Sequence, residues 1–146
     1  MRKKYFFFDI DGTLTDNKTH KIVPSAKRTL DQLKANGHFV SIATGRAHYK
    51  AVSFTDKINI HNIVCNGGGC IVIDDQVVNL QPIPLKESIH VLEQADQNHV
   101  GWLLALNDDD TVIMKDYRFL ETAGRRKELT TYLYDPSLDY HTLPSI

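Results

Sequence analysis

Apolar blocks and helical patterns alternate along the first half of the chain. The block Tyr5–Phe8 is apolar at successive positions, which is typical of a strand covered on both faces. After Pro24 the apolar residues recur at helical spacing, with Ser25 as the expected cap and Gly37 as the expected stop. The sequence therefore opens with a predicted strand followed by a predicted helix.

The alternation continues beyond Gly37 and indicates a fold class. The stretches Phe39–Thr44 and Asn62–Cys65 are expected to be strands, and a second helix is expected between them. Strands that alternate with helices favour a parallel sheet with right-handed crossovers. We therefore predict a doubly wound, Rossmann-like α/β core.

The second half of the chain has a different pattern. Asn66–Gly69 is a glycine-rich break, and Cys70–Leu80 reads as a hairpin that turns at Asp74, Asp75 and Gln76. A helix is expected over Leu85–Gln97, and Val100–Lys115 is expected to form two strands around an acidic turn. The last segment, 125–134, fits a helix or a strand. We expect core residues in 1–66 and part of a smaller α+β cap in 67–146.

Composition and charge exclude several classes of partner but do not indicate a function. The 146 residues carry 17 Lys and Arg against 18 Asp and Glu, without a long like-charge run, so nucleic acid and anionic membranes are not expected partners. No stretch is long and apolar enough for a signal peptide or a membrane span. Two cysteines are too few for a disulfide framework and lack zinc spacing, so a reducing cytoplasm is the expected location.

Two carboxylates end the first predicted strand. Asp9 and Asp11 are two positions apart, so they can point to the same side at the carboxyl edge of the sheet, where α/β proteins bind ligands. Gly12 permits the turn that leaves the strand. Acidic residues also end many strands at plain solvent-exposed turns, but the full run D-I-D-G-T-L-T after an apolar strand favours a functional pair.

These residues resemble the first motif of the haloacid dehalogenase-like (HAD) hydrolase superfamily, an apolar strand followed by D-x-D-G-T-[LV]. Thr44 in "VSIATGR" is similar to the second motif, an apolar strand that ends in Thr or Ser. "ATGR" followed by "NGG" resembles the Cof-type, sugar-phosphatase-like subgroup. In that subgroup a cap follows the third core strand.

The resemblance implies a magnesium-dependent phosphatase that acts on a small phosphorylated metabolite. Asp9 is then the nucleophile and Asp11 the acid and base. Mg²⁺ is implied at the Asp9 carboxylate and the Asp11 backbone carbonyl. Phosphate oxygens are implied to contact the Thr44 hydroxyl and backbone N–H groups at Ile10 and at Gly45, where a helix is expected to begin.

Further polar residues have two interpretations each. Arg46 can contact substrate or lie on a solvated helix surface, and Asn66 can touch substrate or only permit a left-handed turn. Asp108–Asp110 follow an apolar run, but a solvated hairpin turn is favoured over a metal site. Arg125 and Arg126 can contact the non-reacting part of a substrate, although an exposed helix face is the simpler interpretation.

Two family motifs, a lysine on a helix after the cap and a late acidic strand end, do not appear after Asn66. We therefore expect an incomplete core, the N-terminal portion of a longer protein. In such a portion the strand Tyr5–Phe8 has an open edge, through which the chain can self-associate. A catalytically inert phosphate-binding or regulatory relative is the alternative. A phospho-acceptor receiver domain is disfavoured, because Cys65 and Asn66 stand where a receiver needs an acidic acceptor.

Overall fold

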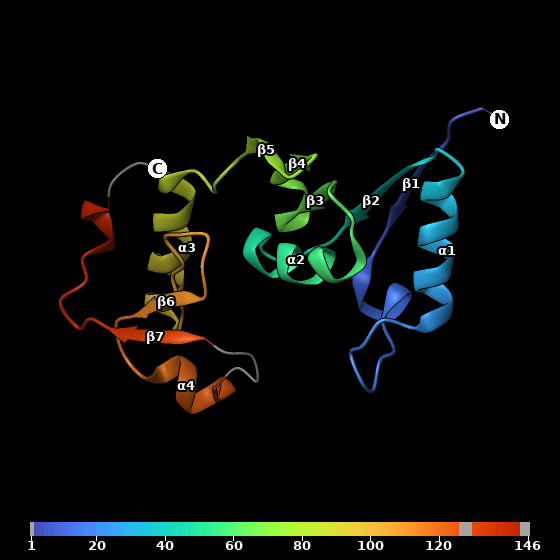
Figure 1. The fold of residues 1–146 in the computed structure, drawn as a ribbon. Helices are drawn as coiled ribbons and strands as arrows, with labels where there is room; N and C mark the ends of the chain where they lie inside the picture. The colour runs from blue at the N-terminus through green and yellow to red at the C-terminus, as the bar shows by residue number, and fades with distance from the viewer. Residues whose placement is uncertain (1, 126–129, 144–146) are drawn as a thin grey trace. The chain divides into compact units, whose positions relative to one another are not determined.

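A computed structural model describes residues 2–125 and 130–143 of the chain. The chain divides into two compact units, Met1–Gln81 and Pro82–Ile146, which are described separately below (Figure 1). None of the helices within the described ranges is long and apolar enough to cross a membrane.

The first unit is built on a five-stranded sheet in the order β1-β2-β3-β4-β5. Strands β1 (Tyr5–Phe8), β2 (Phe39–Ala43) and β3 (Ile63–Cys65) are parallel. Strands β4 (Cys70–Ile73) and β5 (Gln76–Leu80) continue the sheet in antiparallel pairing. The predicted α/β class with a parallel sheet is confirmed.

Helices α1 (Pro24–Ala35) and α2 (His48–Thr55) join the parallel strands and share one buried cluster with them. Successive right-handed crossovers that run in one direction place their helices on the same face of a sheet. The cluster contains buried side chains of α1 (Leu30), α2 (Ala51), β2 (Val40, Ile42), β3 (Ile63, Cys65) and β4 (Cys70, Val72). This core fixes the carboxyl ends of β1, β2 and β3 beside one another.

Strand β1 buries only one of its faces within residues 2–125 and 130–143. Phe6 and Phe8 are half-buried, whereas Tyr5 and Phe7 on the opposite face are 65% and 56% exposed. The burial expected on both faces is absent because α1 and α2 cover the same face. Among the described strands, β1 pairs with β2 alone, so its other edge is open. Self-association through this edge stays a prediction.

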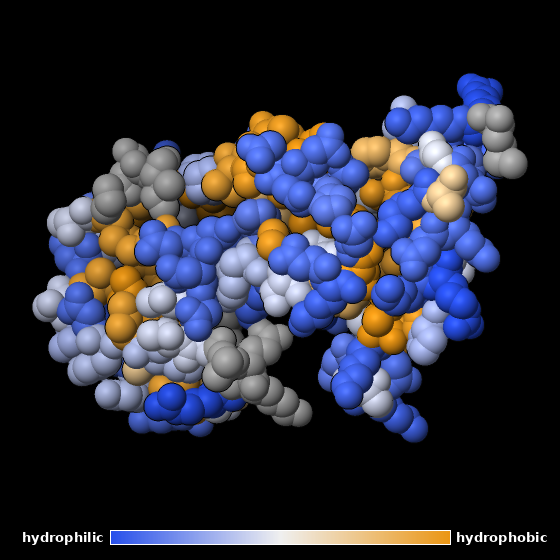
Figure 2. Space-filling model, viewed as in Figure 1, coloured by the Kyte–Doolittle hydropathy of each residue, from blue (hydrophilic) through white to orange (hydrophobic). Residues whose placement is uncertain are grey.

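The hairpin belongs to the sheet of the first unit. Asp74 and Asp75 both have positive φ, which gives the tight turn between β4 and β5. Figure 2 shows apolar surface over this hairpin, where Val77, Val78 and Leu80 are exposed. Because β4 pairs with β3, the first compact unit extends to Gln81, and the boundary expected after residue 66 falls inside it.

Helix α1 begins without the expected side-chain cap. Pro24 is its first residue and Val23 its N-cap, so Ser25 lies inside the first turn, where its carbonyl accepts a hydrogen bond from Thr29. Proline needs no N–H partner and is preset for this position. Gly37 follows the end of the helix with φ 75°, as expected for a C-terminal stop.

The second unit contains α3 (Leu85–Gln97), β6 (Thr111–Met114), α4 (Arg118–Ala123) and β7 (Thr131–Tyr134), with β6 and β7 parallel. Helix α3 has the predicted bounds. Only one strand forms in the range where two were expected, and Leu104 reaches β6 through a single bridge to Ile113.

Two features explain the differences in the second unit. A Cβ added at Gly101 would overlap the backbone nitrogen of Phe119, so the chain there approaches the start of α4 closely instead of continuing as a strand. Helix α4 was not predicted, because six residues are too few to show a helical period. The strand alternative for 125–134 is confirmed by β7, and residues 126–129 lie outside the described part.

Candidate active site

The acid pair lies where β1 ends. Asp9 leaves the strand in extended geometry, and Ile10 after it is fully buried in the core. The backbone N–H and the hydroxyl of Thr15 both donate to the Ile10 carbonyl, at 3.1 and 3.0 Å, which closes a short helical turn over Ile10–Leu14. Gly12 has φ 79° within that turn, a conformation that favours glycine.

A cleft of about 340 Å³ lies at the carboxyl ends of the three parallel strands. Asp9 contributes from the end of β1, Thr44 and Gly45 follow β2, and Gly67 and Gly68 follow β3. Ala43 and Val64 complete its lining. The structure thus brings together the predicted nucleophile and two of the predicted phosphate-binding residues. The run "NGGG" indicates a break and, as "NGG", resembles the Cof-type subgroup, but it does not by itself predict that Gly67 and Gly68 line the cleft.

Thr44 is held firmly beside this cleft. Its residue is 8% exposed, its backbone N–H donates to the Val64 carbonyl at 2.8 Å, and its hydroxyl oxygen accepts the backbone N–H of Arg46 at 3.2 Å. The hydroxyl hydrogen can still donate to a ligand. The expected helix start at Gly45 is wrong, because α2 begins at His48.

Asn66 serves the start of α2. Its side-chain oxygen accepts the backbone N–H of His48 at 3.0 Å, and its own backbone has φ 52°. The left-handed geometry matches one of the two interpretations of Asn66, and the bond to His48 satisfies a donor that the helix itself leaves unpaired. A contact between Asn66 and substrate stays a prediction.

Asp11 forms a two-point ion pair with Arg46. The Arg46 Nε donates to Oδ2 at 2.9 Å and an Nη donates to Oδ1 at 2.6 Å. This hydrogen bonding holds the pKa of Asp11 below its ordinary value, although burial opposes the shift. The Asp11 side chain is 54% exposed, so it can still be reached from solvent.

The donor set fits magnesium in chemistry. The Asp9 carboxylate and the Asp11 backbone carbonyl are oxygen donors, which Mg²⁺ prefers, and this ion commonly keeps several waters and few protein ligands. In the described ranges, no three His, Cys, Asp or Glu side chains gather closely enough to hold a metal ion. The oxygen donors that the chain offers Mg²⁺ at the end of β1 are those of Asp9 and Asp11.

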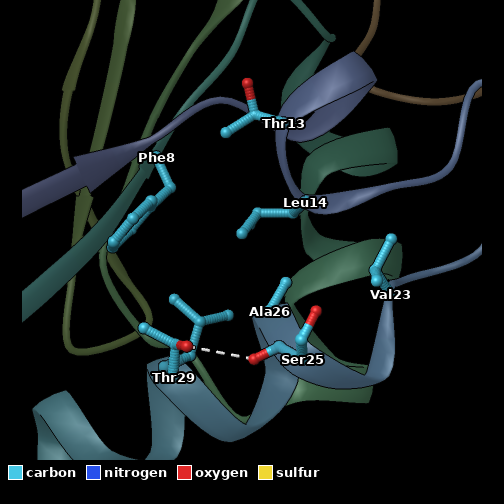
Figure 3. A pocket seen from close by; sticks show the side chains of 8 residues that line it. Phe8, Thr13, Leu14, Val23, Ser25, Ala26 and Thr29 are labelled. Atoms are coloured by element: carbon cyan, nitrogen blue, oxygen red, sulfur yellow. Dashed lines mark hydrogen bonds between the residues drawn. The ribbon is translucent and has the colours of Figure 1, made fainter.

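A second hollow of about 290 Å³ lies in the first unit, between the end of β1, the turn Ile10–Leu14 and α1 (Figure 3). Phe8 and Leu14 point into it, and Thr29 closes one side with its hydrogen bond to Ser25. None of its lining residues ionises near neutral pH. It is an apolar hollow on the packed face of the sheet and lacks the groups for phosphate chemistry.

The remaining polar candidates have structural contacts. Asp109 accepts the backbone N–H of Thr111 at 2.7 Å, which agrees with the turn predicted for Asp108–Asp110. The Arg125 guanidinium lies 5.4 Å from the centre of the Tyr132 ring. Arg126 lies outside the described residues. A substrate contact of either arginine stays a prediction.

Known proteins match this chain over most of its length. The model of the haloacid dehalogenase-like hydrolase family matches residues 6–142. The chain belongs to this family. YkrA of Bacillus subtilis, a candidate phosphatase, is 34% identical over 128 residues, which cover 87% of this HAD chain and 49% of YkrA. Phosphatase YwpJ of the same organism is 30% identical over 73 residues, half of the chain and 25% of YwpJ.

Solved structures agree with this membership at the level of the fold. A HAD phosphatase from Bacteroides thetaiotaomicron has a TM-score of 0.72 at 23% identity, covering 93% of this chain and 50% of that one. A sugar phosphatase of HAD subclass IIB has a TM-score of 0.69 at 22% identity, with 91% and 53% covered. The HAD chain thus spans about half the length of these proteins.

Proposed function

We propose that this HAD chain carries the nucleophile and the phosphate-binding residues of a magnesium-dependent phosphatase that acts on a small phosphorylated metabolite. The main support is the cleft shared by Asp9, Thr44 and Gly45. Its volume of about 340 Å³ is near the lower end of ligand pockets, roughly 300–1,000 Å³, which favours a small ester. Buried Cys65 and Cys70 fit a reducing cytoplasm as the proposed location.

The proposed reaction has two steps. A carboxylate oxygen of Asp9 attacks phosphorus, the bond from phosphorus to the leaving oxygen breaks, and Asp11 gives that oxygen its proton. A water oxygen then attacks the phosphorus of the aspartyl-phosphate while the Asp11 carboxylate takes a proton from this water. The bond to Asp9 breaks, inorganic phosphate leaves, and both aspartates return to their starting forms.

Three donors are proposed to hold the phosphate oxygens. Thr44 and Gly45 line the cleft after β2, and Ile10 follows Asp9 at the end of β1. In this proposal the Thr44 hydroxyl and the backbone N–H groups of Ile10 and Gly45 stabilise the charge that develops during transfer. Asp9 and Asp11 would hold the magnesium ion. When bound, this ion offsets the repulsion between the Asp9 carboxylate and an anionic phosphate.

The experiment uses p-nitrophenyl phosphate as a generic ester. We expect the wild-type chain to hydrolyse it with magnesium, and chelation by EDTA to stop the reaction. Asp9→Asn should lower kcat at least about 10³-fold, because the amide is a poor nucleophile. Asp31→Asn, on the exposed side of α1, is the matched control and should keep the wild-type rate. Equal rates for the wild-type chain and Asp9→Asn would disprove the assignment.

The second candidate function is phosphate binding without turnover. One observation favours it: no third acidic or metal-binding side chain joins Asp9 and Asp11 in the part of the chain that the structure describes. Isothermal titration with inorganic phosphate separates the two candidates. Binding that depends on Thr44, together with no hydrolysis by the wild-type chain, supports the inert alternative.

A further inference from the structure

Arg46 and Asp11 share two short hydrogen bonds, although the Asp11 side chain is half-exposed. We propose that Arg46 is a positioning residue for the second step of the reaction. In this role it holds the Asp11 carboxylate in the orientation that accepts a proton from the attacking water. The inference rests on the proposed phosphatase function and assigns Arg46 a role that acts through Asp11 and not on the substrate.

The geometry of the pair restricts the Asp11 carboxylate. Two roughly parallel bonds, Nε to Oδ2 at 2.9 Å and Nη to Oδ1 at 2.6 Å, fix both the position and the rotation of the group. A single ammonium donor would leave that rotation unrestricted. Each carboxylate oxygen has two lone-pair directions, so each keeps one for another donor such as a water.

The arginine is itself fixed on several sides. Its backbone N–H donates to the Thr44 hydroxyl at 3.2 Å, and its backbone carbonyl accepts the N–H of Asn66 at 2.8 Å. Its guanidinium also lies 5.7 Å from the centre of the Phe54 ring. The backbone of Arg46 is thus hydrogen-bonded to Thr44 and to Asn66, which follow β2 and β3 beside the cleft. Its guanidinium therefore holds the Asp11 carboxylate at a fixed position relative to these two segments.

The second step depends on this arrangement more than the first. An ion-paired carboxylate is an acceptor of hydrogen bonds, which is the role of Asp11 when it receives the proton of the water. In the first step Asp11 donates, and a guanidinium, which carries only donors, does not support that role. Loss of Arg46 should therefore slow hydrolysis of the aspartyl-phosphate more than its formation.

The test compares Arg46→Ala and Arg46→Lys with the wild-type chain on p-nitrophenyl phosphate and magnesium. We expect kcat to fall about 10- to 100-fold in both variants, since small misplacement of a catalytic group has effects of this size. Both should release a burst of nitrophenol near one equivalent per chain and accumulate phosphorylated protein. The affinity for inorganic phosphate should change less than about threefold. Arg28→Ala, on the exposed face of α1, is the control.

Other outcomes would overturn the inference. A tenfold loss of phosphate affinity without a burst would make Arg46 a substrate contact, and full activity of Arg46→Lys would show that charge alone suffices. A lowered melting temperature with equal slowing of both steps would show a purely structural role. If the wild-type chain neither turns over nor forms phosphorylated protein, the proposed function itself fails.

A measurement without turnover tests the pair directly. In nuclear magnetic resonance spectra, the Nε–H signal of Arg46 should exchange slowly with water in the wild-type chain. It should exchange rapidly in Asp11→Ala, because its acceptor is gone. An unchanged signal in Asp11→Ala would show that the pair does not form in solution, and the inference would fail whatever the activity.

Discussion

Each compact unit has an arginine–carboxylate pair of similar length, Arg46–Asp11 in the first unit and Arg118–Asp96 in the second. In the first unit Asp11 is 54% exposed and receives two bonds from Arg46. In the second unit Asp96 is 26% exposed, and Arg118 reaches it at 2.9 Å. The distances are alike, but the surroundings differ.

Asp96 is surrounded by donors from separate segments. Its Oδ1 accepts the indole N–H of Trp102 at 3.0 Å as well as Arg118, and its Oδ2 accepts the Tyr140 hydroxyl at 3.1 Å. Arg118 is also bound by Asp116 through Nε at 2.7 Å. Asp96 therefore links α3 to α4 and to the helical turn Tyr140–Thr142, so it joins elements far apart in the sequence.

The two pairs differ in what they contribute to the protein. A partly buried carboxylate with several fixed donors specifies one arrangement of its unit, and removing it leaves those donors unpaired. A half-exposed carboxylate with one arginine contributes little to stability and stays open to a second ligand. We expect the Asp96 cluster to support the fold and the Asp11 pair to support the chemistry.

The largest expected effect is on activity. Asp11→Ala should lower kcat on p-nitrophenyl phosphate about 10²- to 10⁴-fold, the usual contribution of an acid–base group. The free energy of unfolding of the first unit should change by less than about 1 kcal/mol, because the pair is exposed. Initial rates and urea unfolding measure both. A normal rate and a large loss of stability in Asp11→Ala would show that the Asp11 pair supports the fold and not the chemistry.

The second effect is on stability. Asp96→Ala should lower the free energy of unfolding of the second unit by about 3 kcal/mol, because it removes the acceptor of Trp102 and Tyr140 and one of the two carboxylates that bind Arg118. Trp102 is the only tryptophan in the chain, so its fluorescence follows this unit during urea unfolding. Glu87→Ala, an exposed change on the same helix, should have little effect. A similarly small change for Asp96→Ala would contradict the comparison.

Replacing either arginine by lysine should change stability less than Asp96→Ala does, but the loss should again be larger in the second unit. Arg118→Lys should destabilise the second unit by about 1–2 kcal/mol, because lysine cannot bridge two carboxylates with a planar fork. Arg46→Lys should change the stability of the first unit by less than about 0.5 kcal/mol. Thermal unfolding of Arg118→Lys and Arg46→Lys measures the two losses of stability. Equal losses would contradict the different roles assigned to the two pairs.

The smallest effect is a pH dependence of the second unit. Burial raises the pKa of Asp96, but hydrogen bonds from Trp102, Arg118 and Tyr140 outweigh it and hold the pKa below the ordinary value of 3.8. A lowered pKa in the folded state adds stability that is complete above 3.8 and is lost as the pH falls through the folded value. Urea unfolding at pH 3 to 6 should show this loss in the wild-type chain and a weaker one in Asp96→Asn.

The first unit could be predicted from sequence where local patterns were strong. The apolar block before Asp9, the helix after Pro24 and the turn at Gly12 each have a local cause, and the structure contains all three. The two motifs also predicted that Asp9 and Thr44 lie at the carboxyl edge of the sheet, and both line the cleft there. These features depend on residues that are close in sequence.

The features that could not be predicted depend on contacts between distant segments. Arg46 binds a side chain 35 positions away, and Tyr140 binds one 44 positions away, so no local pattern indicates either bond. The irregular chain at Gly101 follows from its approach to α4, a helix too short to have a visible period. Tertiary contacts override local preference at these places.

The most direct test of the central claim is the site of phosphorylation. The wild-type chain is mixed with p-nitrophenyl phosphate and magnesium, quenched in acid within the first turnover, and digested for mass spectrometry. We predict phosphate on Asp9, in the peptide that follows β1, with more of it retained in Arg46→Ala. Phosphate on Asp11, or turnover in wild-type and Arg46→Ala chains without any phosphorylated aspartate, would contradict the account.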